Sequence, residues 1–119
     1  MSRLLSEHVH ARGRRRAGVL LTFVYVLNLV PRLRAESAWT DADRATVSAH
    51  FQHLSSATER GRLILAGRTD EPMDRRFGLV IFEAESDEAA QAFMQADPAV
   101  AAGVMTATLH PYSIALQRK

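Results

Sequence analysis

Apolar and β-branched residues gather in four segments of the chain that have the length and composition of strands. These segments span residues 21–30, 62–66, 77–84 and 106–117. Runs of this kind, closed by proline or glycine, are typical of strands that pack in the interior of a sheet. Proline has no N–H to donate, so Pro111 inside the last run predicts an edge strand or a bulge.

Two longer segments between these strands have the spacing of amphipathic helices. The first is expected from the N-cap Thr40 to about Gly61. Its apolar stripe consists of Val47, Phe51, Leu54 and Thr58. The second helix is expected to follow the N-cap Ser86. Its buried stripe consists of Ala89, Ala90, Phe93 and Met94.

Weaker local signals complete the order of the elements. Asp97-Pro98 begins and Gly103 ends a further short helical turn, because Asp, Pro and Gly favour those positions. Residues 32–39 and 69–76 carry no apolar pattern and are expected to form loops. The resulting order, β-α-β-β-α-β, predicts an α+β domain with the ferredoxin-like arrangement.

The first predicted strand is apolar on both of its faces. Phe23, Tyr25 and Leu27 alternate with Val24 and Val26. The helices of a ferredoxin-like fold cover one face of the sheet, so the other apolar face needs a separate cover. We therefore expect a second copy of the chain to cover it, in a homodimer.

Length and composition restrict the possible chemistry. The 119 residues support one domain, and 47% apolar residues are enough for a hydrophobic core. The absence of cysteine excludes disulfides, thiol nucleophiles and cysteine-based metal sites. The sequence also lacks the phosphate-binding, dinucleotide-binding, serine-hydrolase and zinc-protease motifs. No cofactor and no metal are expected.

Positive charge is concentrated at the N-terminus. Residues 1–34 contain seven arginines and one glutamate, whereas the rest of the chain is mildly acidic. We interpret residues 1–16 as a flexible Arg-rich extension and 17–119 as the single domain. Because the body is acidic, no nucleic-acid surface is expected on it, although contact through Arg12–Arg16 stays a third hypothesis.

The arginine run is followed by apolar residues 17–30, an arrangement similar to a signal sequence. Asn28 interrupts the apolar run, Pro31-Arg32 follows it in place of a cleavage site, and it is too short to span a bilayer. We therefore expect a strand here, no membrane partner and a cytoplasmic protein.

Several stretches of the chain resemble the YciI-like (YCII-related) family. They are residues 47–54 (VSAHFQHL), 61–67 (GRLILAG), 86–93 and, most specifically, 96–104 (ADPAVAAGV). The resemblance runs from about residue 21 to residue 116 and implies the dimeric α+β-barrel version of the ferredoxin-like fold. It also implies an active-site pair, His50 on the first helix and Asp97 in the Asp-Pro segment. Relatives include a dehydrochlorinase of chlorinated hydroxyhydroquinones, and lactone isomerases share the wider fold. Ala99 replaces the aromatic residue of many members, which predicts a more open pocket wall.

The residues themselves allow two interpretations of this pair. His50 lies at the margin of the apolar stripe, where imidazole acts as a general acid or base or packs with its nitrogens satisfied locally. Asp97 caps the short helix, and its second oxygen can orient the imidazole as in a catalytic dyad.

Three further residues are candidates for substrate binding. Arg68 follows a strand and can bind an anionic group, although a solvated loop arginine is the ordinary case. Tyr25 is a candidate pocket wall, with ordinary core packing as the alternative. His53 forms an H-x-x-H pair with His50, and the alternatives for it are a metal ligand or a solvent-facing side chain.

The leading hypothesis is a cofactor-independent enzyme that transfers protons through the His50–Asp97 dyad. Isomerisation or elimination, such as dehydrochlorination, of a small aromatic-derived acid or lactone fits that chemistry. The alternative is a non-catalytic dimer of the same fold that binds a small ligand or serves as an accessory protein. A fold alone does not assign a substrate.

Overall fold

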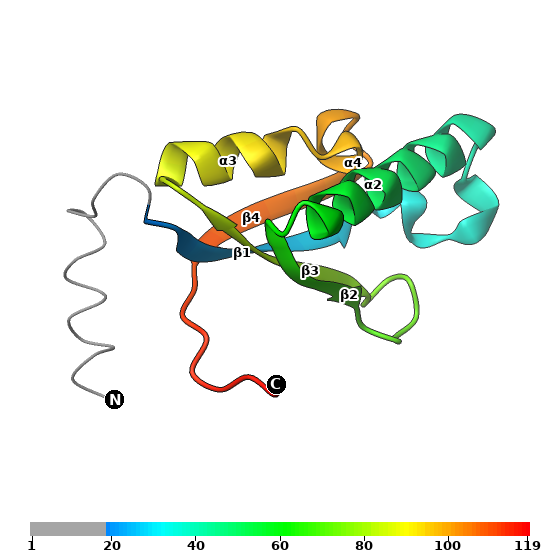
Figure 1. Ribbon diagram of the computed structural model, residues 1–119. Coiled ribbons are helices and arrows are strands. Elements are labelled where there is room, and N and C mark those ends of the chain that lie inside the picture. The colour runs from blue at the N-terminus through cyan, green and yellow to red at the C-terminus, as the bar shows by residue number, and fades with distance from the viewer. Residues whose placement is uncertain (1–18) are drawn as a thin grey trace.

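The computed structural model describes residues 19–119, in which four strands form one antiparallel sheet. The strands are β1 (Leu21–Leu29), β2 (Leu63–Arg68), β3 (Phe77–Ala84) and β4 (Met105–Pro111), and their order across the sheet is β2-β3-β1-β4 (Figure 1). The ferredoxin-like α+β class predicted from the sequence is confirmed. The predicted extension, residues 1–16, lies outside the described residues.

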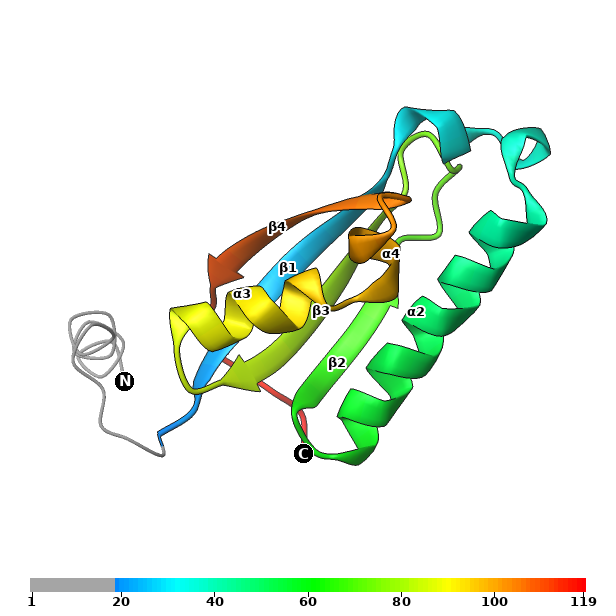
Figure 2. The same cartoon turned by 90° about the horizontal axis from the view of Figure 1, so that it is seen from above.

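The helices α2 (Asp41–Glu59), α3 (Asp87–Gln95) and α4 (Pro98–Ala101) all lie on one face of the sheet (Figure 1). Seen from above, α2 runs beside the edge strand β2, and α3 crosses the other half of the sheet (Figure 2). None of the helices within residues 19–119 is long and apolar enough to cross a bilayer.

The segment between β1 and α2 differs from the prediction. Residues 32–39, expected to be a loop, contain two short 3-10 helices, Pro31–Arg34 and Glu36–Ala38. Leu33 from the first of them is fully buried, and the Trp39 indole N–H donates to its carbonyl at 2.8 Å. Burial of a single leucine and local turn bonds therefore order this connection.

A network of side chains fixes the start of α2. The Thr40 hydroxyl accepts the Asp43 N–H at 3.1 Å, and the Asp43 carboxylate accepts the Thr40 N–H at 2.8 Å, which is a reciprocal capping box. Arg32 donates to both oxygens of Asp43 at 2.9 Å. The hydrogen bonds from Arg32 and then Thr40 hold the pKa of Asp43 below its usual range.

The core lies between the sheet and the helices. Its largest fully buried side chains include Tyr25, Phe23 and Phe82, and the rings of Tyr25 and Phe82 meet edge to face at 5.7 Å. The predicted stripe of the first helix is wrong at Phe51, whose side chain is 67% exposed, and at Thr58, which is also exposed. The reason is that α2 lies beside the edge strand β2 (Figure 2). There the helix buries Leu54 and Ala57, and the side of the helix that carries Phe51 remains exposed.

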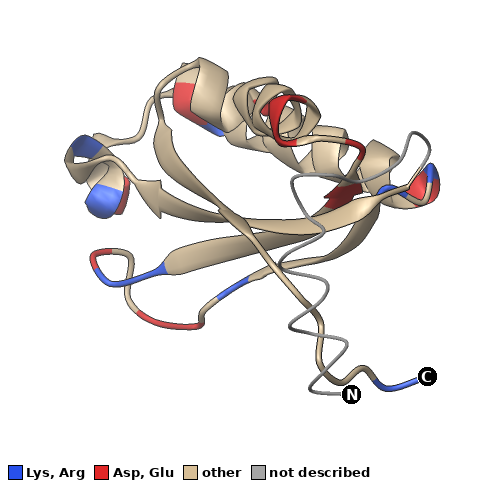
Figure 3. Cartoon of the chain, turned by 90° about the vertical axis from the view of Figure 1, so that its left-hand side faces the viewer, with Lys and Arg blue, Asp and Glu red and all other residues tan. Residues whose placement is uncertain are grey.

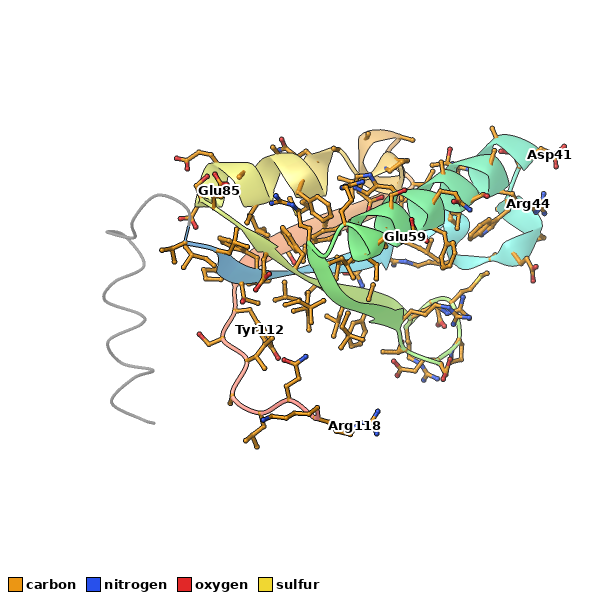
Figure 4. The ribbon with its side chains drawn as sticks, in the orientation of Figure 1. Asp41, Arg44, Glu59, Glu85, Tyr112 and Arg118 are labelled. Carbon is orange, nitrogen blue, oxygen red and sulfur yellow. The ribbon has the colours of Figure 1, made fainter. Side chains whose placement is uncertain are left out.

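The last strand is shorter than predicted. It ends at Pro111 instead of residue 117, and the segment after it lies beneath the face of the sheet that carries no helices (Figure 1). The registered pairing of β4 with β1 ends at Pro111 and Phe23, and one further backbone bond follows it, from the Tyr112 N–H to the Thr22 carbonyl at 3.0 Å. Tyr112, labelled in Figure 4, lies in this segment on the side away from the helices.

Candidate active site

Asp97 joins α3 to α4 and is the N-cap of α4. Its Oδ1 accepts the backbone N–H of Ala99 at 3.0 Å, and Pro98 occupies the first helical position. The Asp97 side chain is fully buried, although an unpaired carboxylate would be costly there. Its remaining acceptor sites are therefore expected to have partners, and two residues distant in sequence supply them.

The first distant partner is His50, on the face of α2 that packs against α4. His50 Nδ1 lies 2.7 Å from Asp97 Oδ1. An ionised carboxylate only accepts, so Nδ1 carries the proton, and in a neutral ring Nε2 keeps its lone pair. No described residue bonds Nε2, yet this atom is not buried. The second ring nitrogen is thus available to another molecule.

The second distant partner is Tyr25 on the central strand β1. Its hydroxyl donates to Asp97 Oδ2 at 2.7 Å. Burial and then the negative charge of Asp97 raise the pKa of Tyr25, so the hydroxyl stays protonated and remains a donor. The structure places Tyr25 behind Asp97, with no exposed surface, and not on the wall of the cavity described below.

The charge of Asp97 is maintained by its partners. Burial by itself raises the pKa of this carboxyl, but the hydrogen bonds from His50 and Tyr25, the charge of the imidazolium and the Ala99 N–H outweigh it. The pKa of Asp97 therefore lies below its ordinary value. An ionised Asp97 fixes the tautomer of His50 and can stabilise the imidazolium that forms when Nε2 accepts a proton.

A cavity of about 720 Å³ opens beside His50. One wall is α2, and the floor is formed by β1, β2 and β3. The lining is mainly apolar and includes Leu27, Leu54, Val80 and Trp39. A cavity of this size, apolar with a few polar groups, has the character of a small-molecule site.

The predicted substrate-binding residues lie in different places. Arg68 lines the cavity, whereas His53 does not and packs instead against Phe93, with 5.2 Å between the ring centroids. His53 Nε2 is buried without a hydrogen-bond partner. Within residues 19–119, no group of three or more His, Asp and Glu side chains could hold a metal ion.

Sequence reasoning missed two features of the site. Arg76, at the end of the loop between β2 and β3, lines the cavity together with Arg68. In the sequence, Arg76 is only an arginine directly before a strand, a position that many solvent-exposed arginines also occupy. The expected effect of Ala99 on a pocket wall is wrong, because Ala99 is fully buried in a small cluster with Leu29 and Leu33 and does not line the cavity.

Tyr25→Phe is expected to lower the free energy of unfolding by about 1.5–3 kcal/mol, the usual range for a hydrogen bond to a charged group. The phenyl ring keeps the core packing, but Asp97 Oδ2 loses its donor. Urea unfolding followed by circular dichroism measures the change. Tyr112→Phe is the matched control, because that side chain is partly exposed, and an equal loss in both variants would contradict the role of the Tyr25 hydroxyl.

Comparison with solved structures finds a similar fold. The 5-chloro-2-hydroxyhydroquinone dehydrochlorinase (TftG) from Burkholderia phenoliruptrix AC1100, in complex with 2,5-dihydroxybenzoquinone, superposes with a TM-score of 0.60. The two sequences are 18% identical, and the alignment covers 78% of this chain and 94% of that chain. At this identity the likeness shows a shared fold.

The sequence matches a family model, although no curated protein matches it. The family model described as YCII-related domain matches residues 25–109, a stretch that contains Tyr25, His50, Arg68 and Asp97. The match covers most of the sequence, as the resemblance of the helix and Asp-Pro segments predicted, and the chain therefore belongs to the YCII-related domain family.

Proposed function

We propose that this protein is a cofactor-independent enzyme in which His50 transfers a proton and Asp97 orients and stabilises the imidazole. The observation that carries the proposal is the 2.7 Å contact between His50 Nδ1 and Asp97 Oδ1 beside an apolar cavity. Nε2 accepts a proton from an acidic C–H or O–H of the substrate. The imidazolium then returns the proton to another atom, which completes an isomerisation.

Elimination uses the same groups. His50 removes a proton from one carbon while a leaving group such as chloride departs with its electron pair from the neighbouring carbon, and a double bond forms between them. A positioned base contributes about 10²–10⁴-fold, so the C–H bond has to be acidic already, as it is beside a carbonyl group. The dehydrochlorinase that shares the fold supports this choice of reaction class. Small hydroxyquinones and lactones are the proposed substrates.

The proposal is tested by a screen for proton transfer in D₂O. We expect the protein to accelerate the exchange of acidic C–H protons of chlorinated hydroxyquinones or of unsaturated lactones above the rate in buffer, as followed by NMR. EDTA is expected to leave the rate unchanged. Binding of these compounds without exchange or turnover would favour the alternative, a ligand-binding dimer of the same fold.

We also propose that the chain forms a homodimer through the face of the sheet that carries no helices. Apolar side chains on this face, Leu65 and Leu79, are 60% and 39% exposed. Leu65 on β2 lies opposite Ile81 on the neighbouring strand β3, and Leu79 lies two residues before Ile81, on the same face of β3. Exposed apolar patches of this kind mark association surfaces. A sedimentation equilibrium that gives the monomer mass at micromolar concentration would contradict the dimer.

A further inference from the structure

Two arginines give one end of the cavity a positive charge. Arg68 is the last residue of β2, and Arg76 directly precedes β3. The loop between them is closed by a hydrogen bond from the Thr69 N–H to the Phe77 carbonyl at 2.9 Å, so the two arginines flank the base of one hairpin. Figure 3 shows basic segments where both strands meet this loop.

The strand register directs Arg68 toward the helix-covered face. Arg68 is paired with Gly78, and Gly78 is paired with Leu27, which belongs to the core beneath the helices. Residues directly opposite in a sheet share a face. Gly78 has no side chain, and a Cβ there would lie 3.6 Å from the Leu27 Cβ. A glycine here therefore lets Leu27 and the β2 backbone approach β3 closely, and no side chain stands between Leu27 and Arg68 in the cavity floor.

The guanidinium groups keep unused donors. Arg76 is half-buried, and its Nε donates to the Glu71 carbonyl at 3.2 Å, which fixes the group while no other described residue bonds its two terminal nitrogens. One terminal nitrogen of Arg68 donates to the Thr69 carbonyl at 3.3 Å and lies 3.8 Å from Asp70, whose side chain is fully exposed. Surface pairs of this kind are weak. Both arginines can therefore bind an incoming anion.

The acidic residue of the cavity lies at the opposite end. Glu59 is the last residue of α2, and a short turn connects it to the start of β2. A strand rises about 3.3 Å per residue, so the six residues of β2 separate this end from Arg68 by roughly 17 Å. Charge along the cavity is therefore asymmetric, with His50 and apolar side chains between the ends.

We infer that the cavity binds a small molecule with an apolar body and one terminal oxyanion, a carboxylate or a phosphate. Arg76 and Arg68 bind the oxyanion, and the apolar body lies against Leu27 and Trp39. The inference rests on the proposed function only in placing the reacting carbon of that body beside His50.

Three aromatic probes test the inference, because they share a ring and differ in charge. Benzoate, phenyl phosphate and benzamide are titrated into the full chain while the fluorescence of Trp39 is followed; this is the single tryptophan of the sequence, and it lines the cavity. We expect at least one anion to bind about tenfold more tightly than benzamide. The tighter anion identifies the oxyanion as a carboxylate or a phosphate.

Arg76→Gln is expected to weaken binding of the preferred anion about tenfold and to leave benzamide binding unchanged. Arg75→Gln is the matched control, because Arg75 is exposed and does not line the cavity. Equal affinity for anions and amide, equal effects of the two variants, or no binding of either anion at millimolar concentration would overturn the inference.

The same titration separates this inference from the proposed function. Anion-selective binding in a protein that never exchanges or turns over a substrate would support the inference and contradict the enzyme. Proton transfer without anion selectivity would support the enzyme and contradict the inference.

Discussion

Replacing Asp97 with alanine is expected to lower the free energy of unfolding by about 3–5 kcal/mol, the usual cost of removing one partner from a buried charged network. The change leaves the Tyr25 hydroxyl and the Ala99 N–H without their acceptor in the interior, and α4 loses its N-cap. Small domains have a total stability of about 5–15 kcal/mol, so the loss is a large fraction of it. Urea unfolding at neutral pH measures the change.

Asp87→Ala is the matched control for this prediction. Asp87 lies in the first turn of α3 but is exposed, so its removal is expected to cost no more than about 0.3–1 kcal/mol. Asp97→Asn keeps the shape of the side chain and removes its charge. Asparagine caps helices well, yet it cannot accept all three hydrogen bonds from Tyr25, His50 and Ala99. A loss in Asp97→Ala no greater than that in Asp87→Ala would contradict the network.

The contribution of Asp97 is also expected to depend on pH. Its pKa in the folded protein is lowered from the ordinary value of 3.8, so the stabilisation is present above that pH and is lost as the pH falls through the folded value. The difference in stability between the wild type and Asp97→Ala should therefore shrink in acid. A difference that stays constant from neutral pH to acid would show that the carboxylate charge adds nothing.

Local signals in the sequence predicted most of the fold. Residues 77–84 were predicted as a strand and form β3 with the same bounds. Thr40, Ser86 and Asp97 were predicted as N-caps and all three cap helices. Caps depend on one side chain and the backbone two or three residues away, so they are visible in the sequence.

Features that depend on distant residues were not predictable in the same way. The hydrogen bond from Tyr25 to Asp97 joins residues 72 positions apart, and nothing near Tyr25 distinguishes it from other core aromatics. The exposure of Phe51 follows from the position of α2 beside the edge strand, which is a property of the sheet order. The pairing of His50 with Asp97 was expected from the family resemblance, because helical spacing alone places His50 only at the core margin.

His50→Asn is expected to reduce kcat/KM by about 10²–10⁴-fold for any substrate that the wild type converts, the usual contribution of a general base. The asparagine amide nitrogen occupies about the same position as Nδ1 and can still donate to Asp97, so the buried carboxylate keeps a partner. What the variant lacks is Nε2, the ring nitrogen that no described residue bonds. Steady-state kinetics and D₂O exchange measure the loss.

Two controls make this result specific to the base. His110→Gln removes an exposed histidine of β4 and is expected to leave kcat/KM unchanged. The stability of His50→Asn, measured in urea, should remain closer to the wild type than that of Asp97→Ala, because the asparagine retains a donor for the carboxylate. A folded His50→Asn protein with full activity would exclude His50 as the base.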